Sequence, residues 1–101
     1  MIQVPTMPFN VPLSRVLRKA GWRAKVFDEE GPETPHVTIQ FKTEQFWRVS
    51  LRNRNFIVPP GGRWGDMPDE IRIAIENNWD QLRAYWNRQN PHNPIESRDD
   101  E

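Results

Sequence analysis

Hydrophobic and polar residues alternate in three successive runs in the first half of the chain. The runs span residues 22–27, 35–42 and 45–52, and polar loops separate them. A period of two places successive side chains on opposite faces of a strand. Three such runs joined by short turns predict an antiparallel meander with one buried face. Residues 56–58 are a candidate for a brief fourth strand.

Helical periodicity replaces this alternation on both sides of the meander. Leu13, Val16, Leu17 and Ala20 recur at helical spacing, and Gly21 is a typical helix stop. A longer helix is predicted from an N-cap at Asp66 to about residue 89. Its apolar stripe consists of Ile71, Ala74, Ile75, Trp79, Leu82 and Trp86. The pattern therefore predicts an α+β fold with the order α-β-β-β-α, in which two helices pack on one face of a three- to four-stranded antiparallel meander.

The 101 residues are about one domain's worth of chain. Five Trp and five Phe supply enough large apolar side chains for a folded core. Residues 1–10 are uncharged and are predicted to form an extended N-terminal arm. Residues 11–89 form the single predicted α+β domain, and residues 90–101 are predicted to be a disordered acidic tail.

Several classes of protein are excluded by what the sequence lacks. It has no cysteine, which excludes a disulfide scaffold and thiolate metal sites. No stretch approaches the roughly 18 apolar residues of a membrane span, and the N-terminus does not resemble a signal peptide. We therefore expect a cytoplasmic protein that does not engage a membrane. No cofactor fingerprint or metal-ligand spacing is present, so we expect neither, and the pattern does not indicate an oligomeric state.

The formal net charge of zero conceals an asymmetry between the two halves of the chain. Residues 15–64 contain ten basic and five acidic side chains, a charge of about +5. Residues 65–101 contain four basic and nine acidic side chains, a charge of about −5. A surface polarised in this way attracts a polyanion to one side and repels it from the other.

The alternation also predicts which residues share the polar face of the sheet. They are Arg23, Lys25, His36, Thr38, Gln40, Lys42, Arg48, Ser50 and Arg52, and none is acidic. Lys and Arg suit phosphate contacts, so six of these residues form the predicted nucleic-acid-binding set: Arg23, Lys25, Gln40, Lys42, Arg48 and Arg52. Phe27 and Phe46 share the parity of this face and are candidates for stacking on bases. The alternative is an ordinary solvated sheet face.

His36 is the only histidine inside the predicted domain. A neutral imidazole is the usual general base for ribonucleolytic cleavage, and a cation stabilises the developing phosphate charge. His36 is therefore the candidate base, with Arg48 or Lys42 as the candidate cation. The alternative is a histidine that only forms a hydrogen bond within a strand, and the pattern leaves open whether the protein is an enzyme.

Trp64 lies in the glycine-flanked loop at residues 59–65. It is either a lid that closes the core or an exposed contact for a protein partner. The acidic cluster at residues 28–33 lacks calcium-loop spacing and is interpreted as a solvated turn.

Part of the chain resembles a family of small bacterial proteins of unknown function that are suspected toxin–antitoxin components. That family has a Pro-His-Val-His-Val strand and a C-terminal helix with spaced Trp. The matching residues are Glu33-Thr34-Pro35-His36-Val37-Thr38-Ile39, followed by Trp79, Leu82 and Trp86. Thr38 stands where the family has its second histidine.

The plan of the chain is also similar to that of the HicA-type mRNA interferases. Leu17-Arg18-Lys19-Ala20-Gly21-Trp22, followed by His36 in a strand, looks like their arrangement, although Thr34-Pro35-His36 replaces their Gly-Ser-His signature. The resemblance implies RNA as the partner and His36 as the catalytic residue. Our first hypothesis is an RNA-binding or RNA-cleaving toxin-like protein. The second is a non-catalytic module that binds a small protein through the open sheet face, an edge strand or the Trp64 loop.

Overall fold

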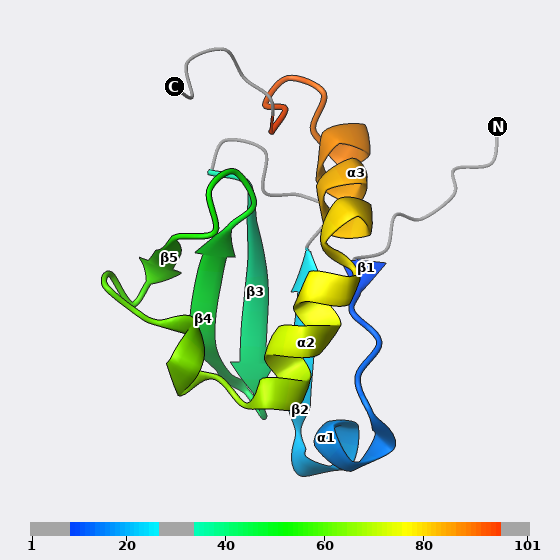
Figure 1. Cartoon of the computed structure of the whole chain (residues 1–101). Coiled ribbons are helices and arrows are strands. Elements are labelled where there is room, and N and C mark those ends of the chain that lie inside the picture. Colours follow the sequence, from blue (N-terminus) through cyan, green and yellow to red (C-terminus); the bar gives the residue numbers. More distant parts are fainter. Residues whose placement is uncertain (1–8, 27–33, 96–101) are drawn as a thin grey trace, which may run out of the picture.

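The structure is a computed structural model that describes residues 9–26 and 34–95, with the backbone alone for residues 45 and 46. Within those ranges the strands are β1 (Phe9–Asn10), β2 (Trp22–Val26), β3 (His36–Phe41), β4 (Glu44–Ser50) and β5 (Phe56–Val58). The helices are α1 (Arg15–Ala20), α2 (Asp69–Asn77) and α3 (Trp79–Gln89), with a 3-10 helix, η1 (Trp64–Asp66), before α2. Figure 1 shows α2 and α3 across one face of the sheet and α1 beside the end of β2. The α+β class is confirmed, although the described chain has more strands and helices than the sequence predicts.

The three alternating runs form the central meander, as predicted. β2 pairs antiparallel with β3, with Trp22 opposite Phe41. β3 pairs antiparallel with β4, with His36 opposite Ser50. The backbone NH of Lys42, in the turn between β3 and β4, donates to the carbonyl of Gly21 at 2.8 Å. This bond holds the β3–β4 turn against the end of α1.

Two short strands extend the meander, so the described sheet runs in the order β1-β2-β3-β4-β5. β1 lies within the predicted extended arm and pairs with β2, with Phe9 opposite Val26. The rest of that arm, residues 1–8, lies outside the described residues. β5 forms where a brief fourth strand was predicted, with Val58 opposite Arg48. A two-residue strand is too short to leave an alternating pattern, which is why the sequence does not predict β1.

α1 is shorter than the predicted helix and buries less of its apolar side. Ser14 is the N-cap, and its hydroxyl accepts a bond from the backbone NH of Leu17 at 3.2 Å. Leu13 is buried just before the helix, whereas Val16 is 76% exposed. Because α1 lies at the end of the sheet, only the side that carries Leu17 faces the core, and the expected apolar stripe is incomplete.

The predicted long helix is two helices, because the chain breaks at Asn78. The Asn78 side-chain amide donates to the carbonyl of Ala74 at 2.8 Å, so it competes with the helical backbone bonds at that point. The predicted N-cap is also wrong: Asp66 belongs to η1, and Pro68 occupies the N-cap of α2. Asp69 and Glu70 occupy the first turn of α2, where their charges complement the helix dipole.

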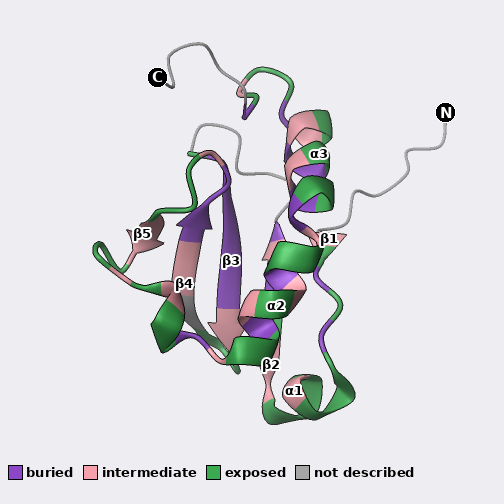
Figure 2. Ribbon diagram, viewed as in Figure 1, coloured by how far each residue is buried: buried purple, intermediate pink, exposed green. Residues whose placement is uncertain are grey.

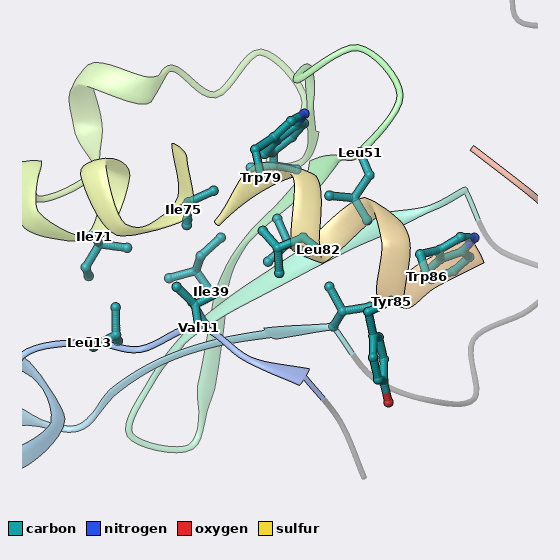
Figure 3. Close-up of a cluster of buried hydrophobic side chains, with 14 of the residues drawn as sticks. Val11, Leu13, Ile39, Leu51, Ile71, Ile75, Trp79, Leu82, Tyr85 and Trp86 are labelled. Atoms are coloured by element: carbon teal, nitrogen blue, oxygen red, sulfur yellow. The ribbon is translucent and has the colours of Figure 1, made fainter. Parts of the chain in front are cut away.

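The core lies between the sheet and the pair α2 and α3. Figure 3 shows the inward side chains of both helices against residues of the sheet and of the segment before α1. The labelled residues of this cluster are Val11, Leu13, Ile39, Leu51, Ile71, Ile75, Trp79, Leu82, Tyr85 and Trp86. All of them are buried, and six are fully so, which confirms the two apolar patterns that the sequence shows for the sheet and for the C-terminal helices.

The chain after α3 folds back on the domain as far as Ile95. The Trp86 indole donates to the carbonyl of Asn93 at 2.8 Å, and Arg52 donates to the side-chain oxygen of Asn93 at 3.0 Å. The backbone NH of Ile95 donates to Asn87, and the Ile95 side chain is 2% exposed. Residues 90–95, which the sequence assigns to a disordered tail, therefore belong to the packed domain. Residues 96–101 lie outside the described residues.

Candidate functional site

The predicted polar face of the sheet is not uniformly open to solvent. His36, Thr38 and Ser50 are at most 4% exposed, which contradicts their assignment to a solvent face. Figure 2 shows β3 buried over most of its length. Thr38 is a small residue paired with Lys25 on one side and Arg48 on the other, and long side chains of this kind cover a short neighbour. Alternation predicts which side of a strand a residue occupies but not whether that side is covered.

His36 lies in the core against α3. Its ring centroid is 5.9 Å from that of Trp86, with the planes tilted by 51°. The Nδ1 atom is 2.7 Å from the Thr34 carbonyl oxygen, which can only accept a hydrogen bond. The side chain is 1% exposed. A general base must reach the proton that it removes. In this conformation a substrate hydroxyl has no access to His36.

The two candidate cations for catalysis lie at different places along the sheet. Arg48 is opposite Thr38, two residues from the His36 position. Lys42 is exposed in the turn at the other end of β3. Lys42 is six positions after His36, which in extended chain is a path of roughly 20 Å. The structure therefore does not bring Lys42 together with His36.

The remaining members of the predicted nucleic-acid-binding set differ in their exposure to solvent. Arg23 is exposed, whereas Lys25, Gln40 and Arg52 are half-buried. Arg52 donates through Nη2 to Asn93 and to the Pro94 carbonyl at 3.0 and 3.1 Å, so it holds the C-terminal segment in place. Arg23 lies opposite Gln40, and Thr38 lies between Lys25 and Arg48 in the register, so these members of the set share one face of the sheet. Their role in nucleic-acid binding stays a prediction.

Trp64 has the contacts of a lid. Its indole NH donates to the Arg54 carbonyl at 3.1 Å, and its ring packs edge-on against Phe56 with centroids 5.4 Å apart. Trp64 is half-buried and packs against the core cluster. Its role as a partner contact stays a prediction. Phe27, the side chain of Phe46 and the acidic cluster at residues 28–33 lie outside the described residues.

A different group of cations surrounds an open hollow between α1 and the start of β2. We call this surface the basic hollow. It has a volume of about 530 Å³ and is lined by Arg15, Arg18, Lys19 and Arg23. All four side chains are exposed, and no acid is among the described residues that line the hollow. Of these four, the sequence pattern predicts only Arg23 as a binding residue. The three α1 cations have the pattern of an ordinary solvent-facing helix side.

Gly21 is the local reason why these cations converge. It adopts φ 111° at the C-cap of α1, which reverses the chain so that Arg23 lies beside the last turn of the helix. Arg23 Nη1 then donates to the carbonyls of Arg18 at 3.0 Å and Trp22 at 2.7 Å. A guanidinium has further N–H donors, and no described residue accepts from its Nε or Nη2. Arg23 is therefore held in place with donors left for an anion.

Comparisons with known proteins do not extend this description. No family model, curated protein or solved structure matches the chain. Among the described residues, His, Asp and Glu do not gather in groups of three that could hold a metal ion. No helix in the described ranges is both long and apolar enough to cross a membrane. The candidate site therefore rests on the geometry of this chain alone: a hollow lined by four exposed cations.

Proposed function

We propose that the protein binds RNA through the basic hollow. The observation that carries this proposal is the convergence of four exposed cations from two elements on one concave surface. Arginine binds phosphate oxygens through a planar fork and lysine through a point charge, so this residue set suits a chain of phosphates. The similarity of plan to the HicA-type interferases supports RNA as the polyanion.

The proposal places binding on α1 and Arg23 rather than on the whole sheet face. Within the described chain, no hydrogen bond or ion pair holds the side chains of Arg15 and Lys19, so phosphate can pair with them without breaking an internal contact. The proposed function is binding without cleavage, because His36 is buried against Trp86. The acidic C-terminal half of the sequence would keep the polyanion on the side of the hollow.

The test is fluorescence anisotropy with a labelled, mixed-sequence single-stranded RNA at a series of salt concentrations. The double variant Arg15→Gln/Lys19→Gln should bind roughly tenfold more weakly at low salt, because two exposed charge contacts are lost. Its plot of log affinity against log salt should flatten by about 1.4, the slope expected for two phosphate contacts on a single strand. The RNA should be recovered intact on a denaturing gel.

Arg63→Gln is the matched control, because Arg63 is an exposed arginine outside the hollow. This variant should retain wild-type affinity and salt slope. If the wild-type protein does not bind RNA at low salt, or if Arg63→Gln weakens binding as much as the double variant does, the basic hollow is not an RNA site.

A protein-binding role is the second candidate, and a groove between α1 and α2 favours it. Leu17, Ile73 and Ala74 are among the residues that line this groove, which has a volume of about 290 Å³. Val16 on α1 is 76% exposed and Ile73 on α2 is 46% exposed. Lys19 is one helical turn from Val16, and Glu70 is one turn from Ile73.

These two apolar residues have neighbours of opposite charge, so the surface is self-complementary. A second copy of the chain, related by a two-fold axis, would place Val16 on Ile73 and Lys19 on Glu70 twice. Sedimentation velocity over a concentration series should then show a dimer, and Ile73→Glu should give a monomer. A wild-type protein that remains monomeric across the series would remove this candidate.

A further inference from the structure

Three aromatic side chains gather on neighbouring strands at one end of the sheet. Trp22 on β2 packs against Phe41 on β3, with ring centroids 4.7 Å apart. Trp22 also stacks on Trp47 of β4, with centroids 5.9 Å apart and planes within 7° of parallel. We call Trp22, Phe41 and Trp47 the aromatic cluster. All three side chains are half-buried, and Trp22 and Trp47 pack against the core cluster. Part of each side chain is therefore accessible to solvent.

The aromatic cluster is next to the basic hollow along the chain. Trp22 follows the Gly21 turn that ends α1, and its carbonyl accepts from Arg23 Nη1 at 2.7 Å. The backbone NH of Lys42 donates to the carbonyl of Gly21, the residue before Trp22. The Lys42 Nζ atom lies 5.3 Å from the Phe41 ring centroid. Arg23 of the hollow and Lys42 of the β3–β4 turn therefore both contact the segment at residues 21–22, where the aromatic cluster begins.

We propose that this surface is a binding site for single-stranded RNA in which bases stack on the aromatic cluster while the flanking phosphates contact the basic hollow and Lys42. The inference rests on the proposed RNA-binding function and specifies its substrate class. Rings interleaved with cations are the arrangement by which proteins hold single strands, since every base has a face that can stack. A duplex keeps its base faces inside the helix, so it can use the cations but not the rings.

The structure also indicates why these rings, and not other tryptophans, would serve. Trp86 is fully buried and its indole NH bonds to Asn93. Trp79 is 8% exposed and carries the Arg54 guanidinium over its ring, 4.5 Å from the centroid. Trp64 of η1 is half-buried but packs on Phe56 of β5, outside the aromatic cluster. Trp22 follows the Gly21 turn beside the hollow, and Trp47 is the half-buried tryptophan that stacks on it.

The first experiment compares two oligonucleotides on the wild-type protein, so it does not depend on a variant that folds. One is an oligoadenylate and the other is an abasic ribose-phosphate chain of the same length and charge. Stacking predicts tighter binding of the oligoadenylate by on the order of 5- to 150-fold per stacked base. A blunt RNA duplex should bind no more tightly than the abasic chain.

The second experiment assigns the effect to residues. Trp47→Leu should remove most of the preference for oligoadenylate while leaving the affinity for the abasic chain unchanged. Trp64→Leu is the matched control and should keep the preference, because Trp64 is a half-buried tryptophan outside the cluster. In a 15N spectrum of the wild-type protein, oligoadenylate should shift the indole NH signals of Trp22 and Trp47. The signals of Trp64 and Trp86 should remain in place, because both indoles bond to backbone carbonyls away from the cluster.

The outcomes separate the two proposals. Equal affinity for oligoadenylate and the abasic chain would overturn base stacking and leave phosphate binding by the hollow intact. Absence of binding by either chain would overturn both. A preference for oligoadenylate that survives Trp47→Leu, with no shift of the Trp22 and Trp47 indoles, would place the bases elsewhere and also overturn the assignment.

Discussion

Gly21 has a conformation and a position that a residue with a Cβ atom fits poorly. Its φ is 111°, in the left-handed half of conformational space that L-residues rarely occupy. A Cβ atom built there would lie 2.9 Å from Lys42 Cγ and 3.3 Å from the Lys42 backbone nitrogen. This single glycine therefore permits both the reversal from α1 into β2 and the close approach of the β3–β4 turn.

Gly21→Ala should lower the free energy of unfolding by about 2–4 kcal/mol, because backbone strain and a steric contact add together. Gly61→Ala is the matched control. Gly61 also has a positive φ, 81°, but a Cβ atom added there would meet no described heavy atom within 4 Å. Its loss should be about 1 kcal/mol, from backbone strain alone. Urea unfolding of both variants measures the difference, and equal losses would show that the contact with Lys42 does not matter.

Most elements of the fold could be predicted from periodicity, and the exceptions have identifiable causes. The alternation at Trp22–Val26, His36–Phe41 and Glu44–Ser50 belongs to three paired strands, as predicted. The break at Asn78 is not visible in the apolar stripe, because that stripe continues in phase from Ile75 to Trp79 across it. At the break the Asn78 side chain bonds to a backbone carbonyl, and a bond of this kind leaves no periodic signal in the sequence.

The segment after α3 is the other exception at the level of elements. Its polar, proline-containing sequence predicts a tail, yet a single apolar residue, Ile95, anchors it. A single apolar residue in a polar segment produces no periodic pattern. The sequence therefore does not distinguish an apolar residue that anchors the segment from one that is exposed. Asn93 is the second anchor, through Arg52 and Trp86.

Ile95→Ala should therefore destabilise the protein by about 2–5 kcal/mol, the range for truncation of a buried isoleucine. Ile73→Ala removes the same atoms from a side chain that is 46% exposed, and alanine favours the helix. That control should change stability by no more than about 0.5 kcal/mol. Thermal or urea unfolding compares the two, and similar effects would mean that the segment at residues 90–95 does not contribute to the fold.

At the scale of the whole molecule, the charge asymmetry of the sequence indicates which part of the chain is basic. It does not indicate where on the surface the candidate site lies. The sequence shows that cations concentrate before residue 65, and Arg23 belongs to the predicted binding set. Arg15, Arg18 and Lys19 were missed because a period of 3.6 shows only that they face away from the core. These three cations lie near Arg23 because the chain turns at Gly21. A C-cap glycine followed two residues later by an arginine is the sequence signal that could have predicted this cluster.

His36 illustrates the opposite error at the same scale. Strand alternation predicts that His36 lies on the polar face of the sheet, and a polar face is expected to contact solvent. Trp86 belongs to a helix that begins more than forty residues later, so its contact with His36 is a property of the tertiary structure alone. A candidate site built on one strand's alternation cannot anticipate a distant aromatic side chain that packs against it.

The described edges of the sheet are very short: β1 has two residues and β5 has three. An incoming strand would find only the few backbone groups of β1 or β5 to pair with there, so neither of these two strands offers much of a template for cross-β growth. We therefore expect the folded protein to resist fibril formation on concentration, and fibrils should form only after the domain opens and exposes the interior strand β3.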